Sequence, residues 1–239
     1  MSDARPLVFV LLEDERDLPL LPLAAPLGDV LALSCAPSTE NERLDTLLRR
    51  ARARGAARAA RNTDPVIGGV DYLAIAHVLA CAVRHLCEPR PDAPVLVVAG
   101  DRGRGAVGPA VAERLAVPHL GAVRAVQLDG ARVLVDRLCG AELRRWAGSA
   151  PIVVAWTAAA ATTEEPPPDP ALAVEQLALE ALQITVPELQ YRRRFRPEGG
   201  AAPPTRPHLV SNVELLGDRL ARDGLWPLPS EDAEAPKEP

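Results

Sequence analysis

Short apolar runs recur along the first 160 residues and alternate with longer amphipathic segments. Unbroken runs rich in leucine and β-branched residues predict strands that are covered on both faces of a sheet. This alternation predicts an α/β fold with a doubly wound, mostly parallel sheet and right-handed crossovers. We expect such strands at Leu7–Leu12, Val30–Ser34, Val95–Val98 and Pro151–Trp156. Ala56–Asn62 has poor strand propensity, but its place between two helices predicts a short strand there.

Three segments between these strands have the apolar spacing of helices. Ser38 or Thr39 is placed to cap the first, which has acidic residues in its first turn and arginines near its end at Gly55. The proline-rich stretch before Gly28 leaves little room for a full helix. The other two helices are expected at about 71–86 and 110–115.

The pattern changes after Leu120. Alternating residues on both sides of Asp129-Gly130 predict an antiparallel hairpin over 122–138. A proline-rich acidic linker at 162–170 precedes an expected helix from about Ala171 to Gln183. We therefore expect a nucleotide-binding domain at 1–160. The expected C-terminal extension at 161–239 holds this helix, a partner-contacting arm and a disordered acidic tail.

A glycine-rich loop lies between the strand at 95–98 and the helix that follows Pro109. A strand, a glycine-rich turn and a helix N-terminus together favour phosphate, because backbone amides can approach the anion closely. Gly103, Gly105 and Gly108 spell G-x-G-x-x-G, but no acidic residue is placed as in a dinucleotide fingerprint. A tight turn without a ligand is an equally good interpretation from the loop alone.

Composition narrows the function classes. The 239-residue chain has a net charge of −5, so its overall charge does not favour nucleic acid or an anionic membrane. Its four cysteines are scattered without metal-ligand spacing, which predicts no metal site and a reducing cytoplasm. No segment is apolar enough for a membrane span. His77 and His85 have no acid or nucleophile spaced to partner them, so no catalytic residue is expected.

Several motifs resemble, in the same order, those of the β subunit of electron transfer flavoproteins. Ala99-Gly100 and the segment DRGRGAVGP at 101–109 are similar to that family's A-G-x-x-x-x-D-G-D-T-G-x-V-G-P loop. PIVVA at 151–155 is similar to the close of its signature segment. LSCAP at 33–37 resembles the strand end before its second helix, and VELLGDRLARDGLW near the C-terminus resembles its closing helix.

The resemblance implies a Rossmann-like domain, of the adenine nucleotide α-hydrolase-like type, that forms a heterodimer with an α subunit. In that family the β subunit holds AMP, or a second FAD in bifurcating members, while the electron-carrying FAD is bound mainly by the α subunit. The fold positions the cofactor and tunes its electrostatics. Carried over by position, the cofactor-binding residues are Val10, Cys35, Asp101, Arg102, Gly103, Arg104, Gly105, Ala106 and Val107.

The chain departs from the family pattern in three places. Four residues are missing before Asp101, and Arg102–Arg104 replaces Gly-Asp-Thr, so a hydroxyl donor is lost and two cations are gained. Guanidinium groups can pair with phosphate oxygens, or the long side chains can fill the pocket instead. Leu12–Asp14 replaces basic residues and V-P-D. A lysine-free segment at 162–182 stands where the family has its lysine-containing recognition segment.

Two functions from different classes follow. The first is a β-like subunit that carries electrons with an α subunit between dehydrogenases, including a flavin dehydrogenase as a candidate partner, and an acceptor. The alternative is a non-redox interaction protein that kept the fold and lost the nucleotide. An independent nucleotide-dependent oxidoreductase is a weaker third hypothesis, because no acid, base or nucleophile converges on the loop.

Overall fold

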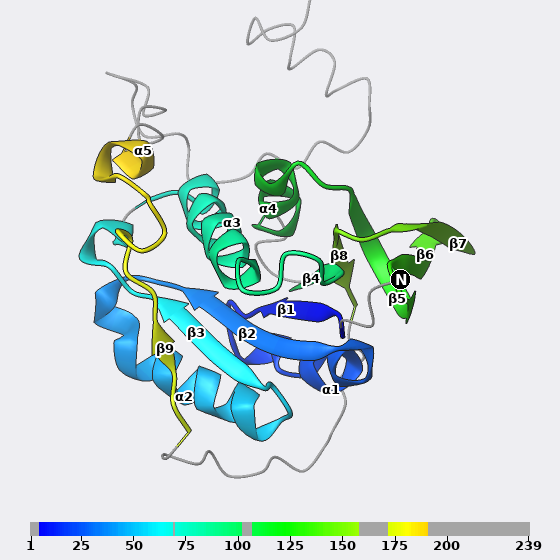
Figure 1. Cartoon of the computed structure of the whole chain (residues 1–239), viewed down its shortest axis with the longest axis horizontal. Coiled ribbons are helices and arrows are strands. Elements are labelled where there is room, and N and C mark those ends of the chain that lie inside the picture. The colour runs from blue at the N-terminus through cyan, green and yellow to red at the C-terminus, as the bar shows by residue number, and fades with distance from the viewer. Residues whose placement is uncertain (1–4, 69, 102–106, 158–171, 191–239) are drawn as a thin grey trace, which may run out of the picture. The chain divides into compact units, whose positions relative to one another are not determined.

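The structure is a computed structural model, and it describes residues 5–68, 70–101, 107–157 and 172–190. Within these ranges nine strands form one sheet in the order β7-β6-β5-β8-β4-β1-β2-β3-β9 (Figure 1). The strands are β1 Leu7–Leu11, β2 Asp29–Cys35, β3 Arg58–Asn62, β4 Val95–Gly100, β5 His119–Asp129, β6 Arg132–Cys139, β7 Glu142–Ser149, β8 Ile152–Trp156 and β9 Glu175–Gln176. The helices are α1 Leu20–Ala24, α2 Asn41–Ala53, α3 Tyr72–Cys87, α4 Val107–Leu115 and α5 Val186–Gln190.

The sheet is parallel from β5 through β8 to β9, and only the β5–β6 and β6–β7 pairs are antiparallel. The expected doubly wound α/β fold and its five parallel strands are therefore confirmed. The hairpin after Leu120 is also confirmed as β5 and β6. The strand expected at Pro151–Trp156 lies inside the sheet as β8, between β4 and β5.

Alternate residues of the central strands enter two separate cores. Leu7, Phe9 and Leu11 of β1 pack on the face covered by α3 and α4. Val8 and Val10 pack on the opposite face, with α1 and α2. All five residues of β1 are buried, because helices cover both faces of a parallel sheet. Figure 1 shows α3 and α4 on one side of the strands and α1 and α2 on the other.

Two expectations about local structure are wrong. No strand was expected at Glu142–Ser149, because the segment ELRRWAGS is too polar to be recognised as one. The helix expected from Ala171 to Gln183 is instead β9 followed by turns. The open edge of β3 explains this second difference, since its backbone pairs with β9 and Arg61 O accepts from Leu177 N at 2.8 Å. Leu179 and Leu182 of this segment are also buried, as are Ile184 and Leu189 after it.

The order of the strands places a switch point between β1 and β4. The chain passes from β1 to β2 and β3 on one side, then returns to β4 on the other side of β1. The loops after β1 and β4 therefore leave the sheet in opposite directions. Such a divergence opens a crevice beyond the carboxyl ends of parallel strands, where α/β proteins bind ligands.

Candidate functional site

A cavity of about 410 Å³ lies at this switch point, a size within the usual range of small-molecule sites. Its walls come from the ends of β1 and β2, the loop after β1, the start of α2, the first turns of α3, and α4. The lining residues are Leu11, Leu12, Glu13, Asp14, Arg16, Asp17, Cys35, Ala36, Pro37, Glu40, Arg43, Tyr72, Ile75, Leu79 and Val107.

The floor of the cavity is apolar. Leu11 and Leu12 at the end of β1, Leu79 of α3 and Val107 of α4 are all buried. The end of β1 is fixed there by a buried hydrogen bond in which Ser34 Oγ donates to Leu12 O at 2.6 Å. This surface suits the uncharged part of a ligand, such as a planar ring.

Cys35 also lines this floor, at the end of β2. Burial raises the pKa of its thiol to about 12, so the thiol stays protonated at neutral pH. A protonated, partly buried thiol behaves as a small apolar side chain and not as a nucleophile. Cys35 can therefore contact a ligand through packing alone.

The loop after β1 is held by Asp17. Its Oδ2 accepts from the backbone N of Glu13 at 2.8 Å and of Asp14 at 3.3 Å. Burial raises the pKa of the Asp17 carboxyl, with the two backbone hydrogen bonds acting in the opposite direction. A Cβ on Gly100 would lie 2.3 Å from Asp17 Oδ1, so only glycine lets the end of β4 approach this loop so closely.

The rim of the cavity is acidic. Its described charged residues are three carboxylates, Glu13, Asp14 and Glu40, and two guanidinium groups, Arg16 and Arg43, while the Asp17 carboxyl that also lines the cavity is buried. Arg16 Nε donates to both oxygens of Asp14 at 3.0 Å, and this pairing lowers the pKa of the Asp14 carboxyl. Arg43 Nε donates to Glu40 Oε2 at 2.7 Å. Both arginines are thus engaged by carboxylates of the chain itself, and the described rim disfavours a phosphate group.

Two helix N-termini reach the cavity wall. α4 begins at Val107, and α3 begins at Tyr72 after its N-cap Asp71, which accepts from Ala74 N at 2.9 Å. The N-terminal partial charges of these helices favour an anion and oppose the acidic rim. The side chain of Tyr72 is 43% exposed at the cavity mouth, where its ring offers a stacking surface.

The structure brings two of the expected site residues to the cavity, Cys35 and Val107. Val10 is fully buried on the α1 and α2 face, and its neighbours Leu11 and Leu12 line the cavity in its place. Asp101 is exposed beyond β4, where its Oδ2 accepts from Thr157 Oγ1 at 2.8 Å. Five of the expected residues lie outside the described ranges: Arg102, Gly103, Arg104, Gly105 and Ala106.

Sequence reasoning did not identify Tyr72, Asp17 or Arg43 as site residues. Tyr72 opens the helix after β3, and the first turn of such a helix faces the carboxyl edge of a parallel sheet. That rule could have identified it. Asp17 and Arg43 come from an irregular loop and from α2, and no sequence motif relates them to the glycine-rich loop.

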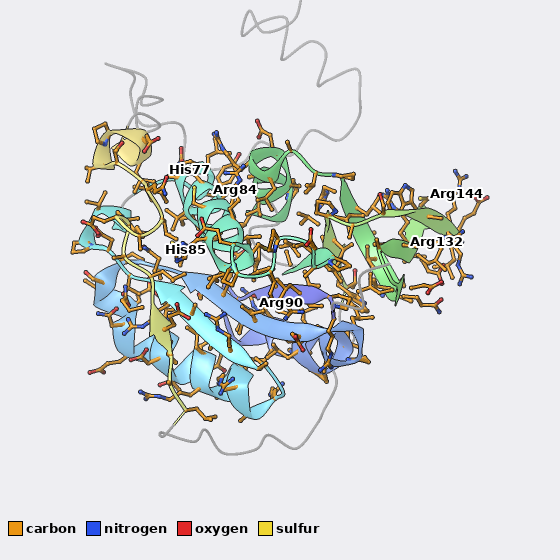
Figure 2. The ribbon with its side chains drawn as sticks, in the orientation of Figure 1. His77, Arg84, His85, Arg90, Arg132 and Arg144 are labelled. Atoms are coloured by element: carbon orange, nitrogen blue, oxygen red, sulfur yellow. The ribbon has the colours of Figure 1, made fainter. Side chains whose placement is uncertain are left out.

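Three other features of the described residues bear on function: possible metal ligands, the histidines of α3, and the length and polarity of the helices. No group of three His, Cys, Asp or Glu side chains there is arranged to hold a metal ion. Figure 2 shows His77 and His85 on α3. The expectation that no acid is spaced to partner these histidines is wrong for His85, because its Nδ1 lies 3.6 Å from Glu88 Oε2, one helical turn away. Each helix in these ranges is too short or too polar to cross a lipid bilayer.

The chain is similar in sequence to known electron transfer flavoproteins. A sequence model of the electron transfer flavoprotein domain matches residues 15–182. The electron transfer flavoprotein subunit beta of Clostridium acetobutylicum is 36% identical over 94 residues, which is 39% of this chain and 34% of that protein. The subunit beta of Thermoanaerobacterium thermosaccharolyticum is 31% identical over 110 residues, 46% of this chain and 40% of that protein. The aligned part thus spans less than half the length of either relative.

Proposed function

The chain belongs to the electron transfer flavoprotein family and is similar to its β subunits, and we therefore propose that it is the β-like subunit of such a flavoprotein. It pairs with an FAD-bearing α subunit and carries electrons between dehydrogenases and an acceptor. It holds AMP, or a second FAD, with the base in the cavity and the phosphates at the loop Asp101–Val107. The cytoplasm is the proposed location, since all four cysteines are free thiols.

The cavity at the switch point is the observation that carries this proposal. Its apolar floor and the ring of Tyr72 suit an adenine base, and the N-termini of α3 and α4 favour an anion nearby. Because the described rim is acidic, the phosphates depend on the loop, where Arg102 and Arg104 supply the cations. A bound FAD would supply redox chemistry, whereas AMP would supply none. The residues of this chain bind the nucleotide, orient it and exclude water.

The first experiment is to co-express the chain with its genomic neighbours and purify it by a tag. We expect an α-like subunit to co-purify with flavin absorbance in the visible spectrum and with nucleotide released by heat. About one FAD and one AMP per heterodimer supports a simple carrier, and about two FAD without AMP supports bifurcation. A colourless complex without adenine nucleotide contradicts the proposal.

A second experiment tests the loop directly. AMP or FAD should raise the melting temperature of the chain, because a ligand that binds only the folded state stabilises it. Arg102→Ala combined with Arg104→Ala should abolish that rise. The matched control is Arg5→Ala with Arg58→Ala, which removes two exposed arginines just before β1 and at the start of β3, at the opposite ends of the strands from the cavity. An equal loss of the rise in the control would exclude a specific role for the loop arginines.

The acidic rim favours one second candidate, a non-redox interaction protein that kept the fold and lost the nucleotide. Three carboxylates that are not buried line the cavity, and the two arginines beside them are already paired. Under this alternative no adenine nucleotide changes the melting temperature, although a partner subunit still co-purifies. The same two experiments therefore separate the candidates.

A further inference from the structure

Strand β7 forms one edge of the sheet. It pairs with β6 over eight residue pairs, from Cys139↔Glu142 to Arg132↔Ser149, and with no other strand in the described part of the chain. Five of its first six side chains and Ser149 at its end are exposed or nearly so. The backbone N–H and C=O groups that alternate along its outer side are thus open to another strand.

Strand β7 lacks several of the usual protections of an edge strand. Natural edges are shortened, bulged, or carry proline or charged side chains, lysine above all. Residues 142–149 include neither proline nor lysine, and the register with β6 has no shift along its length. Trp146 covers Gly148, because a Cβ on that glycine would lie 1.9 Å from the indole ring. The result is a long and regular edge.

The charged side chains of β7 pair with partners inside the ribbon of β5–β7. Arg145 donates to both oxygens of Asp136 on β6, at 2.7 and 2.8 Å. Arg144 donates to Glu142 at 2.8 Å. Both guanidinium groups are thus engaged by carboxylates of the ribbon itself. Leu143, at 62% exposed, is the most exposed large apolar side chain of the described residues.

The surrounding ribbon is basic within an acidic chain. Residues 119–149 include five arginines and three carboxylates, whereas the whole chain has a net charge of −5. Figure 2 shows Arg132 and Arg144 at the outer side of this ribbon. Two copies of the ribbon would bring like charge together, so a second copy of the chain is disfavoured.

We propose that β7 is the docking edge for an extended strand of the partner subunit, which carries carboxylates beside that strand. This inference rests on the proposed function, since it names the surface that the partner uses. The main-chain ladder provides affinity, and the basic ribbon with Leu143 selects an acidic strand with an apolar side chain.

The hairpin geometry identifies which backbone groups to remove. Gly140 and Ala141 form a two-residue turn, so the flanking pair Cys139 and Glu142 is a hydrogen-bonded pair. Even-numbered residues of β7 then bond to β6, and odd-numbered residues direct their N–H outward. Ala147→Pro therefore removes one outward donor and leaves the ladder to β6 intact.

The test measures binding of the co-expressed partner subunit to the tagged chain. Ala147→Pro should weaken the complex about tenfold or more, whereas Ala147→Ser, which keeps the backbone donor, should bind like the parent chain. An affinity of Ala147→Pro within about twofold of the parent would overturn the proposal.

Leu143 provides a second variant in case the proline disturbs folding, because its exposed side chain does not hold the fold. Leu143→Glu should weaken the complex several-fold more than Leu143→Arg, if the partner strand is acidic. Equal effects would overturn the acidic partner. A homodimer in sedimentation that Ala147→Pro dissociates would assign β7 to a second copy instead, against the proposal.

Bound nucleotide keeps this test separate from the proposed function. A complex that retains nucleotide but is insensitive to every β7 variant overturns the docking edge and leaves the proposed function standing. A chain without partner or nucleotide overturns both.

Discussion

The central strands and the ribbon of β5–β7 share one hydrogen-bonded sheet but differ in what covers them. All residues of β1 and β8 are buried, while β7 is exposed along most of its length. In the centre, stability comes from apolar burial on two faces. In the ribbon, it comes from cross-strand pairing with one half-covered face. The centre can therefore hold a cavity, and among the described residues the ribbon leaves the outer side of β7 unpaired.

The largest contrast is expected from deleting one large side chain in each region. Phe9 is fully buried in β1, so Phe9→Ala should lower the free energy of unfolding by about 3–5 kcal/mol. Leu143→Ala in β7 should change it by less than about 0.5 kcal/mol. Urea unfolding followed by circular dichroism measures both. Comparable losses would mean that the ribbon is packed as tightly as the centre.

Alanine substitution of one glycine in each region should have effects of intermediate size on the free energy of unfolding. Gly100→Ala places a Cβ against the buried carboxyl of Asp17, which two backbone amides hold in place, and should cost about 1–3 kcal/mol. Gly148→Ala meets the far end of the Trp146 ring, which is only partly buried against the core, so a smaller cost, below about 1 kcal/mol, is expected. Thermal unfolding of both variants decides this. The reverse order would show that Trp146 is fixed more firmly than Asp17.

The smallest effects concern pH, and they have opposite signs in the two regions. Burial raises the pKa of Asp17 above its ordinary 3.8, because the buried site favours the neutral carboxyl. The contribution of Asp17 to the free energy of unfolding is therefore fully present below pH 3.8 and is lost as pH rises through the raised pKa. Arg145 lowers the pKa of Asp136 in the ribbon, so the stability from that pair is present above pH 3.8 and is lost as pH falls through the lowered pKa.

Unfolding free energies measured between pH 2.5 and about 7 test these signs. The parent chain should lose stability relative to Asp17→Asn as pH rises, and relative to Asp136→Asn as pH falls. Carboxyl titration by NMR gives the two pKa values independently. Parallel trends for both variants would refute the assignment of burial to one carboxyl and pairing to the other.

The local patterns predicted the central strands and α2–α4, because each is strongly apolar on one or both faces. They failed at β7, whose arginines and glycine are typical of a loop and become a strand only by pairing with β6. They failed again at 171–183, where leucines at helical spacing are used instead to cover the edge of β3 and the core on the α3 face. In both places the neighbouring strand outweighs the propensity of the segment.

The candidate site divides in the same way. Cys35 and Val107 follow from the strand end and the helix start that flank them in the sequence. Asp17, Arg43 and Tyr72 reach the cavity from three other segments, which are adjacent only because β1 lies between β4 and β2. The acidic character of the rim could not be seen before these segments were placed together.

The sequence by itself determined the fold class, the family and the glycine-rich loop, since apolar periodicity and contiguous motifs are local properties of a chain. The tertiary structure alone decided where the cavity lies, which charges face it, and that β7 is an edge of the sheet formed by the described residues. These depend on the order of strands in the sheet, and that order is set by contacts between residues far apart in the chain.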